Sequence, residues 1–131
     1  MSTEIEAEKA NIAGYREGYR AREAQQWVQG EQLRQQRLVQ IGEHWPELCA
    51  AFPTLARAYL FGSILKPGHF RPDSDVDVAV EGLAPESFSP LWDALEGSLP
   101  EHVIDLCTLE PETFFGQQVQ KQGLVLYERG D

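Results

Sequence analysis

A glycine–serine pair followed by two closely spaced aspartates constrains this 131-residue chain more than any other feature. Gly62-Ser63 ends the apolar run 59–61, and Asp75 and Asp77 begin twelve residues after the serine. The apolar run predicts a buried strand that enters a tight turn, and valines alternating with the aspartates predict a second strand. Because side chains two apart in a strand share a face, the two carboxylates project together, about 6–7 Å apart at the backbone.

This arrangement has the residue types that phosphate and metal chemistry needs. Glycine lets the backbone approach a phosphate closely, and a serine hydroxyl and amide can donate to it. Two carboxylates on one face can coordinate divalent cations that carry a triphosphate. A third carboxylate, Asp105, lies inside the otherwise apolar run 102–107, where burial is costly unless something compensates it. Alternatively, Asp105 is a partly exposed strand residue or pairs with an arginine. The combination is typical of enzymes that transfer phosphoryl groups from nucleotides.

The charge of the chain is unevenly distributed. Residues 1–44 carry six Lys/Arg and seven Asp/Glu, whereas residues 45–131 carry five against fourteen, a net charge of −9. An acidic domain without a basic stripe repels duplex nucleic acid, so we expect no direct binding of duplexes. A cationic protein partner or a metal-bound nucleotide fits this surface better.

The sequence also indicates a compartment. Cys49 and Cys107 are the only cysteines and form no C-x-x-C motif, so we expect two reduced thiols in a cytoplasmic protein. The charged residues 1–9 contain no apolar run of a signal peptide, and no stretch approaches the length of a membrane span.

A long N-terminal helix is predicted before the motifs. Residues 4–44 are rich in helix formers and contain no proline, and Gly30 predicts a weak point in the helix. We expect residues 1–30 to form a helical extension. Tyr15, Tyr19 and Trp27 would lie on this arm away from the motifs, where they would meet a partner, fold back on the domain or form a dimer. Further elements are predicted as strands at 57–61, 75–81, 102–107 and 124–127, and as helices at 88–95 and 111–122.

The segment from Gly62 to Val80 resembles the active-site hairpin of the minimal nucleotidyltransferases, in the DNA polymerase beta nucleotidyltransferase superfamily. The strand around Asp105 is a weaker second motif, and 123–127 is similar to the family's last strand. The resemblance implies an α/β (α+β) nucleotidyltransferase fold over residues 31–131, a small mixed sheet with helices packed on one side, preceded by the long N-terminal helix. It implies Asp75, Asp77 and Asp105 as catalytic residues and ligands of two Mg²⁺ ions.

In the family, Gly62 and Ser63 would hold the triphosphate of ATP. Two departures occur in the loop that follows. Eleven residues separate the serine from the first aspartate where the family commonly has ten, and Lys66-Pro67 replaces the usual Arg-Gly. Lys66 keeps a positive charge for a phosphate but loses the bidentate fork, and proline removes an amide donor. Lys66 or Arg71 would neutralise charge on the leaving pyrophosphate, or both are solvated loop cations.

Many minimal nucleotidyltransferases are antitoxins whose partner is a HEPN ribonuclease toxin. The resemblance therefore implies transfer of AMP from ATP to a tyrosine of such a toxin, within a homo- or hetero-oligomer. One alternative is a binding module that neutralises its partner by occlusion without transfer. Another is nucleotidyl transfer to a small molecule, which needs an acceptor pocket that a chain of this length hardly supplies.

Overall fold

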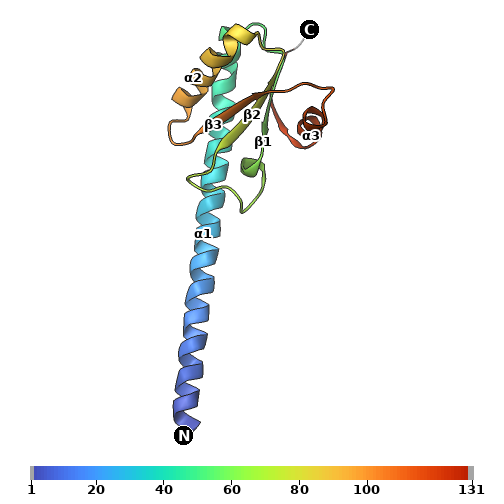
Figure 1. The fold of residues 1–131 in the computed structure, drawn as a ribbon. Coiled ribbons are helices and arrows are strands. Elements are labelled where there is room, and N and C mark those ends of the chain that lie inside the picture. The colour runs from blue at the N-terminus through green and yellow to red at the C-terminus, as the bar shows by residue number, and fades with distance from the viewer. Residues whose placement is uncertain (1, 130–131) are drawn as a thin grey trace.

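The computed structural model describes residues 2–129 as a small α+β domain with one very long helix (Figure 1). Helix α1 spans Ser2–Ala51 and leads into a four-stranded sheet with the strand order β3-β2-β1-β4. The other elements, in chain order, are β1 (Arg57–Phe61), the short 3-10 helix η1 (Ser63–Leu65), β2 (Val76–Glu81), the 3-10 helix η2 (Pro85–Ser87), α2 (Phe88–Ser98), β3 (Ile104–Thr108), α3 (Phe114–Gln122) and β4 (Leu124–Glu128).

The sheet is mixed. Strand β1 pairs antiparallel with both β2 and β4, whereas β2 and β3 are parallel and are joined through α2. A parallel pair needs such a crossover, and a helix in the connection covers the face of the sheet. The β1–β2 connection carries the residues from Gly62 to Asp75, so the motif lies at one end of the two central strands.

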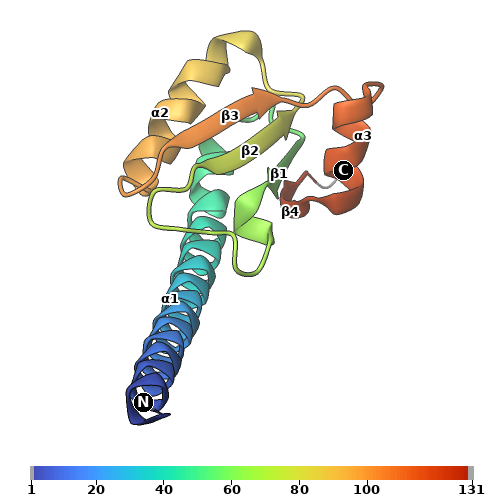
Figure 2. The same cartoon turned by 60° about the horizontal axis from the view of Figure 1, so that its bottom comes forward.

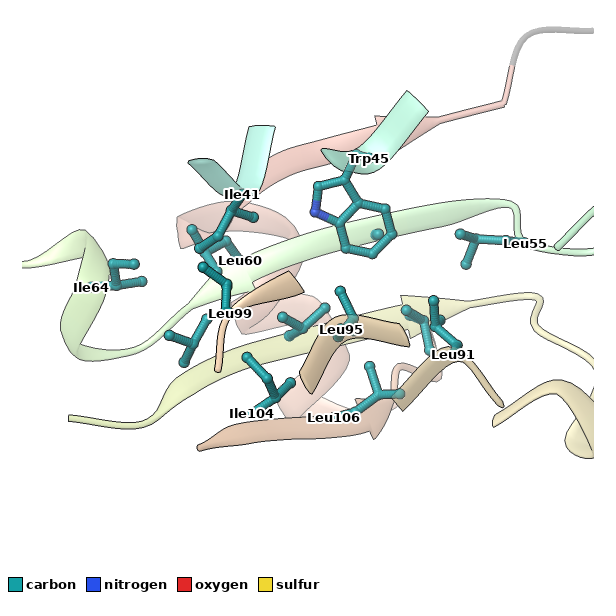
Figure 3. Close-up of a cluster of buried hydrophobic side chains, with 14 of the residues drawn as sticks. Ile41, Trp45, Leu55, Leu60, Ile64, Leu91, Leu95, Leu99, Ile104 and Leu106 are labelled. Carbon is teal, nitrogen blue, oxygen red and sulfur yellow. The ribbon is translucent and has the colours of Figure 1, made fainter. Parts of the chain in front are cut away.

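Helices α1 and α2 cover one face of the sheet and form the main core with it (Figure 3). Ile41 and Trp45 of α1 lie against the sheet and are almost fully buried, as are Leu91 and Leu95 of α2. Their partners on the sheet face are Ala58, Leu60, Val76, Val78, Val80, Ile104 and Leu106. Burying a side chain of this size contributes roughly 1.5–3 kcal/mol, so this layer dominates the stability of the domain.

The opposite face of the sheet is covered by α3 alone. Val119 of α3 packs with Tyr59, Ala79 and Leu109 in a second, smaller cluster. The predicted fold class is confirmed, and the helices at one side are α1 and α2. Helix α3 lies on the other side because the alternation in β1 and β2 gives each strand a second apolar face, through Tyr59 and Ala79.

Helix α1 is longer than the predicted 4–44 and has no break at Gly30, so the predicted weak point is wrong (Figure 2). A β-carbon on Gly30 would lie 3.3 Å from the carbonyl oxygen of Phe70, so this glycine permits a close approach by the loop before β2. The helix also continues through Pro46, where the buried Trp45 holds it on the sheet. Residues 4–29 are exposed, and the N-terminal part of this stretch extends beyond the domain (Figure 1).

Other boundaries lie close to the predicted ones. Strand β2 begins at Val76, which leaves Asp75 one residue before the strand. Helix α3 begins at Phe114 instead of at 111, because Thr113 caps it: its hydroxyl oxygen accepts from the amide of Gly116 at 3.0 Å. None of the helices in residues 2–129 has the length and apolarity that crossing a membrane requires.

Candidate active site

The predicted carboxylates lie near the N-terminal ends of the two parallel strands β2 and β3. Asp77 of β2 and Asp105 of β3 are direct partners in the register, so their side chains lie side by side on one face of the sheet. Asp75 precedes β2 by one residue. The side chains of Asp75 and Asp105 are exposed and that of Asp77 is half-buried. The face they occupy is the one that α3 partly covers, opposite to α1.

The negative charges of Asp75 and Asp105 act on the carboxylate of Asp77. The pKa of Asp77 is raised from its ordinary value, first by burial and then by the negative charges of Asp105 and Asp75. A cluster of this kind favours a divalent cation, which removes the repulsion between the carboxylates. Carboxylate oxygens are the ligands that Mg²⁺ prefers, so the donor set fits this ion. Among the described residues, no three acidic, histidine or cysteine side chains lie close enough together to enclose a metal ion.

The lack of a side chain on Gly62 leaves room for the carboxylate of Asp77. It has φ +84° and ψ −152°, a conformation that only glycine adopts without strain. Its neighbour Phe61 is the register partner of Asp77 across the β1–β2 pair. A β-carbon on Gly62 would overlap with Oδ2 of Asp77, so the carboxylate lies directly over the backbone of the turn. The structure thus brings the predicted phosphate turn and a predicted metal ligand into contact.

Ser63 begins η1, and the turn closes on itself behind it. The amide of Leu65 donates to the carbonyl oxygen of Gly62 at 3.1 Å, and the amide of Lys66 donates to that of Ser63 at 3.0 Å. The side chains of Lys66 and Arg71 are exposed, and within residues 2–129 neither forms an ion pair with an acidic residue. The roles predicted for these residues therefore stay predictions.

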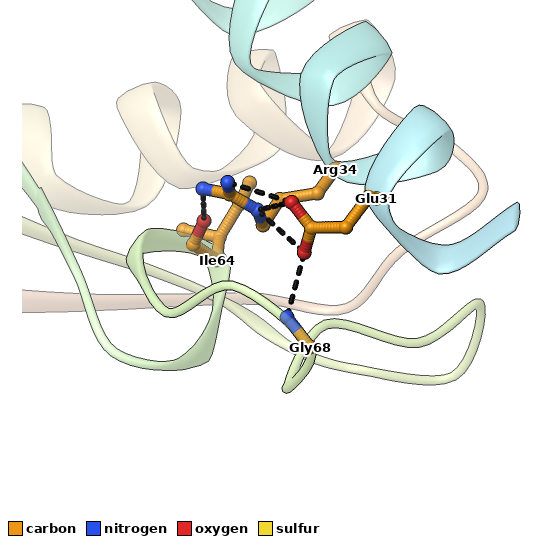
Figure 4. A network of polar contacts seen from close by, with 4 residues as sticks. All are labelled: Glu31, Arg34, Ile64 and Gly68. Carbon is orange, nitrogen blue, oxygen red and sulfur yellow. Dashed lines mark hydrogen bonds and ion pairs between the residues drawn. The ribbon is translucent and has the colours of Figure 1, made fainter. Parts of the chain in front are cut away.

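The sequence reasoning missed a set of polar residues that hold the loop between Ser63 and Asp75. Glu31 and Arg34 of α1 contact the loop directly (Figure 4). His102 is buried, and its Nδ1 lies 2.9 Å from the carbonyl oxygen of Ser74, the residue before Asp75. Nε2 of His102 accepts a hydrogen bond from Nε of Arg37 at 2.9 Å, so Nδ1 carries the proton and donates to Ser74.

A signal for Arg34 was present in the sequence. Arg34, Ile41 and Trp45 recur at spacings of seven and four, which places the arginine on the buried face of α1. His102, in contrast, has no sequence neighbour that reveals its partners, which lie 28 and 65 residues away.

Trp27 was expected away from the motifs, and this is wrong. A β-carbon on Gly68 would come within 2.7 Å of the indole Nε1 of Trp27, so the tryptophan lies against the motif loop. Together with Phe70, Arg71 and residues of α1 from Glu23 onward, Trp27 lines a cavity of about 670 Å³ between the helix and the loop. Tyr15 and Tyr19 are exposed on the arm, so within this chain they do not fold back on the domain.

The comparison with known families agrees with this geometry. Residues 43–131 match the family described as Polymerase beta, Nucleotidyltransferase. The chain belongs to this nucleotidyltransferase family. The match covers the whole sheet, both later helices and the last turns of α1, and so includes all three carboxylates and the Gly62-Ser63 turn.

Several solved structures similar to this chain are toxin–antitoxin complexes. One, a toxin–antitoxin with AMP-PNP, is 29% identical with a TM-score of 0.54, over 67% of this chain and 73% of that chain. A mutant of the toxin–antitoxin MntA–HpeT is 27% identical with the same TM-score and the same coverage. A third, the tri-AMPylated Shewanella oneidensis HEPN toxin in complex with MNT antitoxin, is 26% identical with a TM-score of 0.46, over 75% and 72%. No curated protein matches the sequence.

Proposed function

We propose that this chain transfers a nucleoside monophosphate, AMP from ATP, to a hydroxyl group on a partner protein. The observation that carries the proposal is the contact between the Asp77 carboxylate and the Gly62 turn, with Asp105 as the register partner of Asp77. A phosphate bound at this turn lies next to the carboxylates, as in-line transfer to an acceptor requires. The similar toxin–antitoxin with AMP-PNP supports a nucleotide as the substrate.

Each residue has a role in this reaction. Asp75, Asp77 and Asp105 would hold two Mg²⁺ ions, which supply neutralisation of the triphosphate and a lowered pKa for the attacking hydroxyl. Gly62 and Ser63 bind phosphate oxygens through backbone amides and the serine hydroxyl. Lys66 and Arg71, whose side chains are exposed on the loop, neutralise charge on the leaving pyrophosphate. Asp105, an exposed carboxylate of β3, accepts the proton of the acceptor hydroxyl.

We propose that the acceptor is a tyrosine of a HEPN-type ribonuclease toxin, so that the chain acts as an antitoxin in the cytoplasm. Three observations support this partner. The similar structures are toxin–antitoxin complexes. The strongly acidic residues 45–131 suit a basic partner that cleaves RNA. The exposed Asp75 and Asp105 leave the carboxylate face accessible to a protein substrate.

A labelling experiment tests the transfer. The protein is incubated with ATP labelled at the α-phosphate, Mg²⁺ and lysate of the source organism, beside the double variant Asp75→Asn/Asp77→Asn. The control is Asp93→Asn, which changes one exposed aspartate of α2 outside the site. We expect a labelled protein band with the wild type and the control only. Its mass identifies the acceptor.

The same variants separate transfer from occlusion. If the double variant still neutralises the partner in cells as well as the wild type, the chain acts by occlusion and the catalytic proposal is wrong. If the wild type instead labels a small hydroxylic compound in a lysate freed of protein, the acceptor is a small molecule.

A further inference from the structure

The face of α1 between Trp27 and Arg37 runs along the whole loop that connects the phosphate turn to Asp75. Arg34 Nη1 donates to the carbonyl oxygen of Ile64 at the start of the loop, at 3.2 Å. Glu31 Oε1 accepts from the amide of Gly68 in the middle, at 2.6 Å. Arg37 reaches the end of the loop through His102 and Ser74. One helix therefore fixes the loop at its start, its middle and its end.

These contacts are in regular helical register. Trp27, Glu31, Arg34 and Arg37 follow one another at spacings of four, three and three, which keeps them on one face of α1. Gly30 lies on this face too, where its missing side chain lets the carbonyl of Phe70 approach. One helix, α1, thus holds the first 3-10 turn, the middle of the loop and the residue before the first aspartate.

Glu31 and Arg34 also hold each other. Nη2 of Arg34 donates to Oε2 of Glu31 at 2.8 Å and Nε donates to the same carboxylate at 3.1 Å (Figure 4). The arginine is nine-tenths buried and the glutamate is largely covered. The hydrogen bonds from Arg34 and from the Gly68 amide both lower the pKa of Glu31. The carboxylate is therefore ionised when it accepts the Gly68 amide, and charge-assisted hydrogen bonds are the stronger kind.

The hydrogen bonds of the loop decide which groups remain for a phosphate. Pro67 has no amide hydrogen, and the amides of Leu65, Lys66 and His69 donate to carbonyl oxygens inside the loop. The amide of Gly68 is the remaining one between 65 and 69, and Glu31 accepts it. Residues 65–69 thus have no backbone amide left for a phosphate, which leaves the turn at 62–64 and the loop side chains such as Lys66.

We propose that Glu31 is a positioning residue of the nucleotide site: it ties the middle of the loop to α1 and thereby fixes the phosphate turn and the Lys66 side chain for a nucleoside triphosphate. This inference rests on the proposed function. It assigns to α1, which lies on the face of the sheet opposite to the carboxylates, a part in nucleotide binding. Glu31 acts through the loop and does not touch the nucleotide, and it positions the loop with Arg34.

Two variants of Glu31 separate its two contacts. Glu31→Ala removes the acceptor of the Gly68 amide and the partner of Arg34. Glu31→Gln keeps an acceptor oxygen for the amide but loses the charge, so it restores part of the positioning. Glu43→Ala is the matched control, because Glu43 is an exposed carboxylate on the same helix. All variants are made in the full chain.

The first measurement is calorimetric binding of AMP-PNP in the presence of Mg²⁺. We expect Glu31→Ala to weaken binding about tenfold, which corresponds to about 1.4 kcal/mol, with Glu31→Gln in between and Glu43→Ala equal to the wild type. In the labelling reaction, Glu31→Ala should raise KM for ATP and leave kcat within about twofold, because the carboxylates are untouched.

The second measurement is hydrogen exchange of the nucleotide-free protein. We expect faster exchange in residues 64–74 of Glu31→Ala and unchanged exchange in β1 and β2, a local effect that general destabilisation does not produce. If Glu31→Ala lowers the melting temperature strongly, Arg34→Lys replaces it, because this variant keeps the charge but loses the fork that joins Glu31 to Ile64.

The outcomes distinguish this inference from the proposed function. Equal AMP-PNP affinity and equal exchange in the wild type and Glu31→Ala overturn the role of Glu31 and leave the proposed function standing. A wild type that binds no AMP-PNP at any Mg²⁺ concentration overturns the proposed function, and the positioning role falls with it. Faster exchange without weaker binding shows a loop anchor that the nucleotide does not need, and this also overturns the inference.

Discussion

Asp77 and Asp105 are direct neighbours on two parallel strands, and the carboxylate of Asp77 is half-buried beside that of Asp105. Two negative charges on adjacent register partners repel each other in the absence of a cation. The pKa of Asp77 is raised first by burial and then by this repulsion from Asp105 and Asp75. A bound cation would relieve this repulsion, and without one the two charges lower the stability of the folded protein.

Asp77→Asn should therefore abolish nucleotidyl transfer and raise the melting temperature of the metal-free protein at pH 7. Because the folded-state pKa of Asp77 is raised, its ionised form destabilises the fold as pH rises through that value. The stabilisation by asparagine should thus disappear as pH falls below about 3.8, the ordinary value, where both states are protonated. Calorimetric melting at about pH 3 and at pH 7 measures it. A variant that melts below the wild type at pH 7 would contradict this prediction.

Mg²⁺ should reverse the order of stability. A ligand that binds only the folded state stabilises it by RT ln(1 + L/Kd), where L is the ligand concentration, so the melting temperature rises with the logarithm of the ligand concentration above the dissociation constant. We expect millimolar Mg²⁺ with AMP-PNP to stabilise the wild type, whereas Asp77→Asn should respond weakly. Ca²⁺, which has a looser coordination geometry, serves as the comparison ion. Equal shifts in both proteins would show that the ion binds elsewhere.

Gly62→Ala should impair both folding and transfer. The backbone conformation of Gly62 costs any other residue about 1–3 kcal/mol, and the new methyl group would displace the carboxylate of Asp77. The matched control is Gly97→Ala in α2, where a β-carbon meets open space and where alanine stabilises a helix interior by about 0.5–1 kcal/mol. Urea unfolding and α-labelled ATP assays of both variants check the contrast. Full activity of Gly62→Ala would mean that the turn can relax without loss.

The anchor of Ser74 offers a test of the other end of the loop. His102→Phe retains the ring beside Phe70 but loses the hydrogen bonds to Ser74 and Arg37. It leaves a buried carbonyl without its donor, a loss of about 1–3 kcal/mol in unfolding free energy. Since Asp75 follows Ser74 directly, we also expect a higher Mg²⁺ concentration for half-maximal transfer. His102→Asn, which retains a donor, should recover part of both effects. If the Mg²⁺ dependence stays unchanged in both variants, Ser74 is held without His102.

Cys107 should be a slow nucleophile even though it lies on β3 two residues after the exposed Asp105. Burial, together with Asp105 and Asp77, raises the pKa of its thiol to about 11. Relative to the ordinary value of 9.0, the thiolate fraction at pH 8 falls about a hundredfold, and alkylation slows accordingly. Labelling with iodoacetamide and mass spectrometry measures the rate, and Asp105→Asn should accelerate it. Fast labelling of Cys107 in the wild type would show that the thiol is more open than its surroundings indicate.

The sequence predicted the sheet and the carboxylate pair because both depend on local patterns. The alternation of valines around Asp75 and Asp77 defines a strand and the face of its side chains without reference to the rest of the chain. The family resemblance implied Asp105 as the third carboxylate, but its place directly beside Asp77 depends on the parallel register of β2 and β3, which only the structure shows. The support of the loop could not be predicted in this way. Glu31 accepts from an amide 37 residues away, and Arg37 acts through a histidine 65 residues away.

Gly30 shows why a single residue can mislead. Glycine lowers helix propensity, which favours a break, yet tertiary contacts decide whether the helix continues. Here the turns after Gly30 are held by Arg34 and Ile41 against the domain, so the helix passes through the glycine uninterrupted. The loop carbonyl of Phe70 needed the space that only a glycine leaves. Local sequence does not predict such a requirement, because it arises from a tertiary contact between the loop and the helix.

The exposed part of α1 changes how this molecule behaves in solution. Residues 4–22, which precede the contact of α1 with the motif loop, extend for about 28 Å at the rise of an α-helix. Such a particle diffuses more slowly than a sphere of 14.8 kDa and leaves a gel-filtration column early. An early elution volume is therefore no evidence for a dimer, and the stoichiometry of any complex has to come from light scattering or native mass spectrometry.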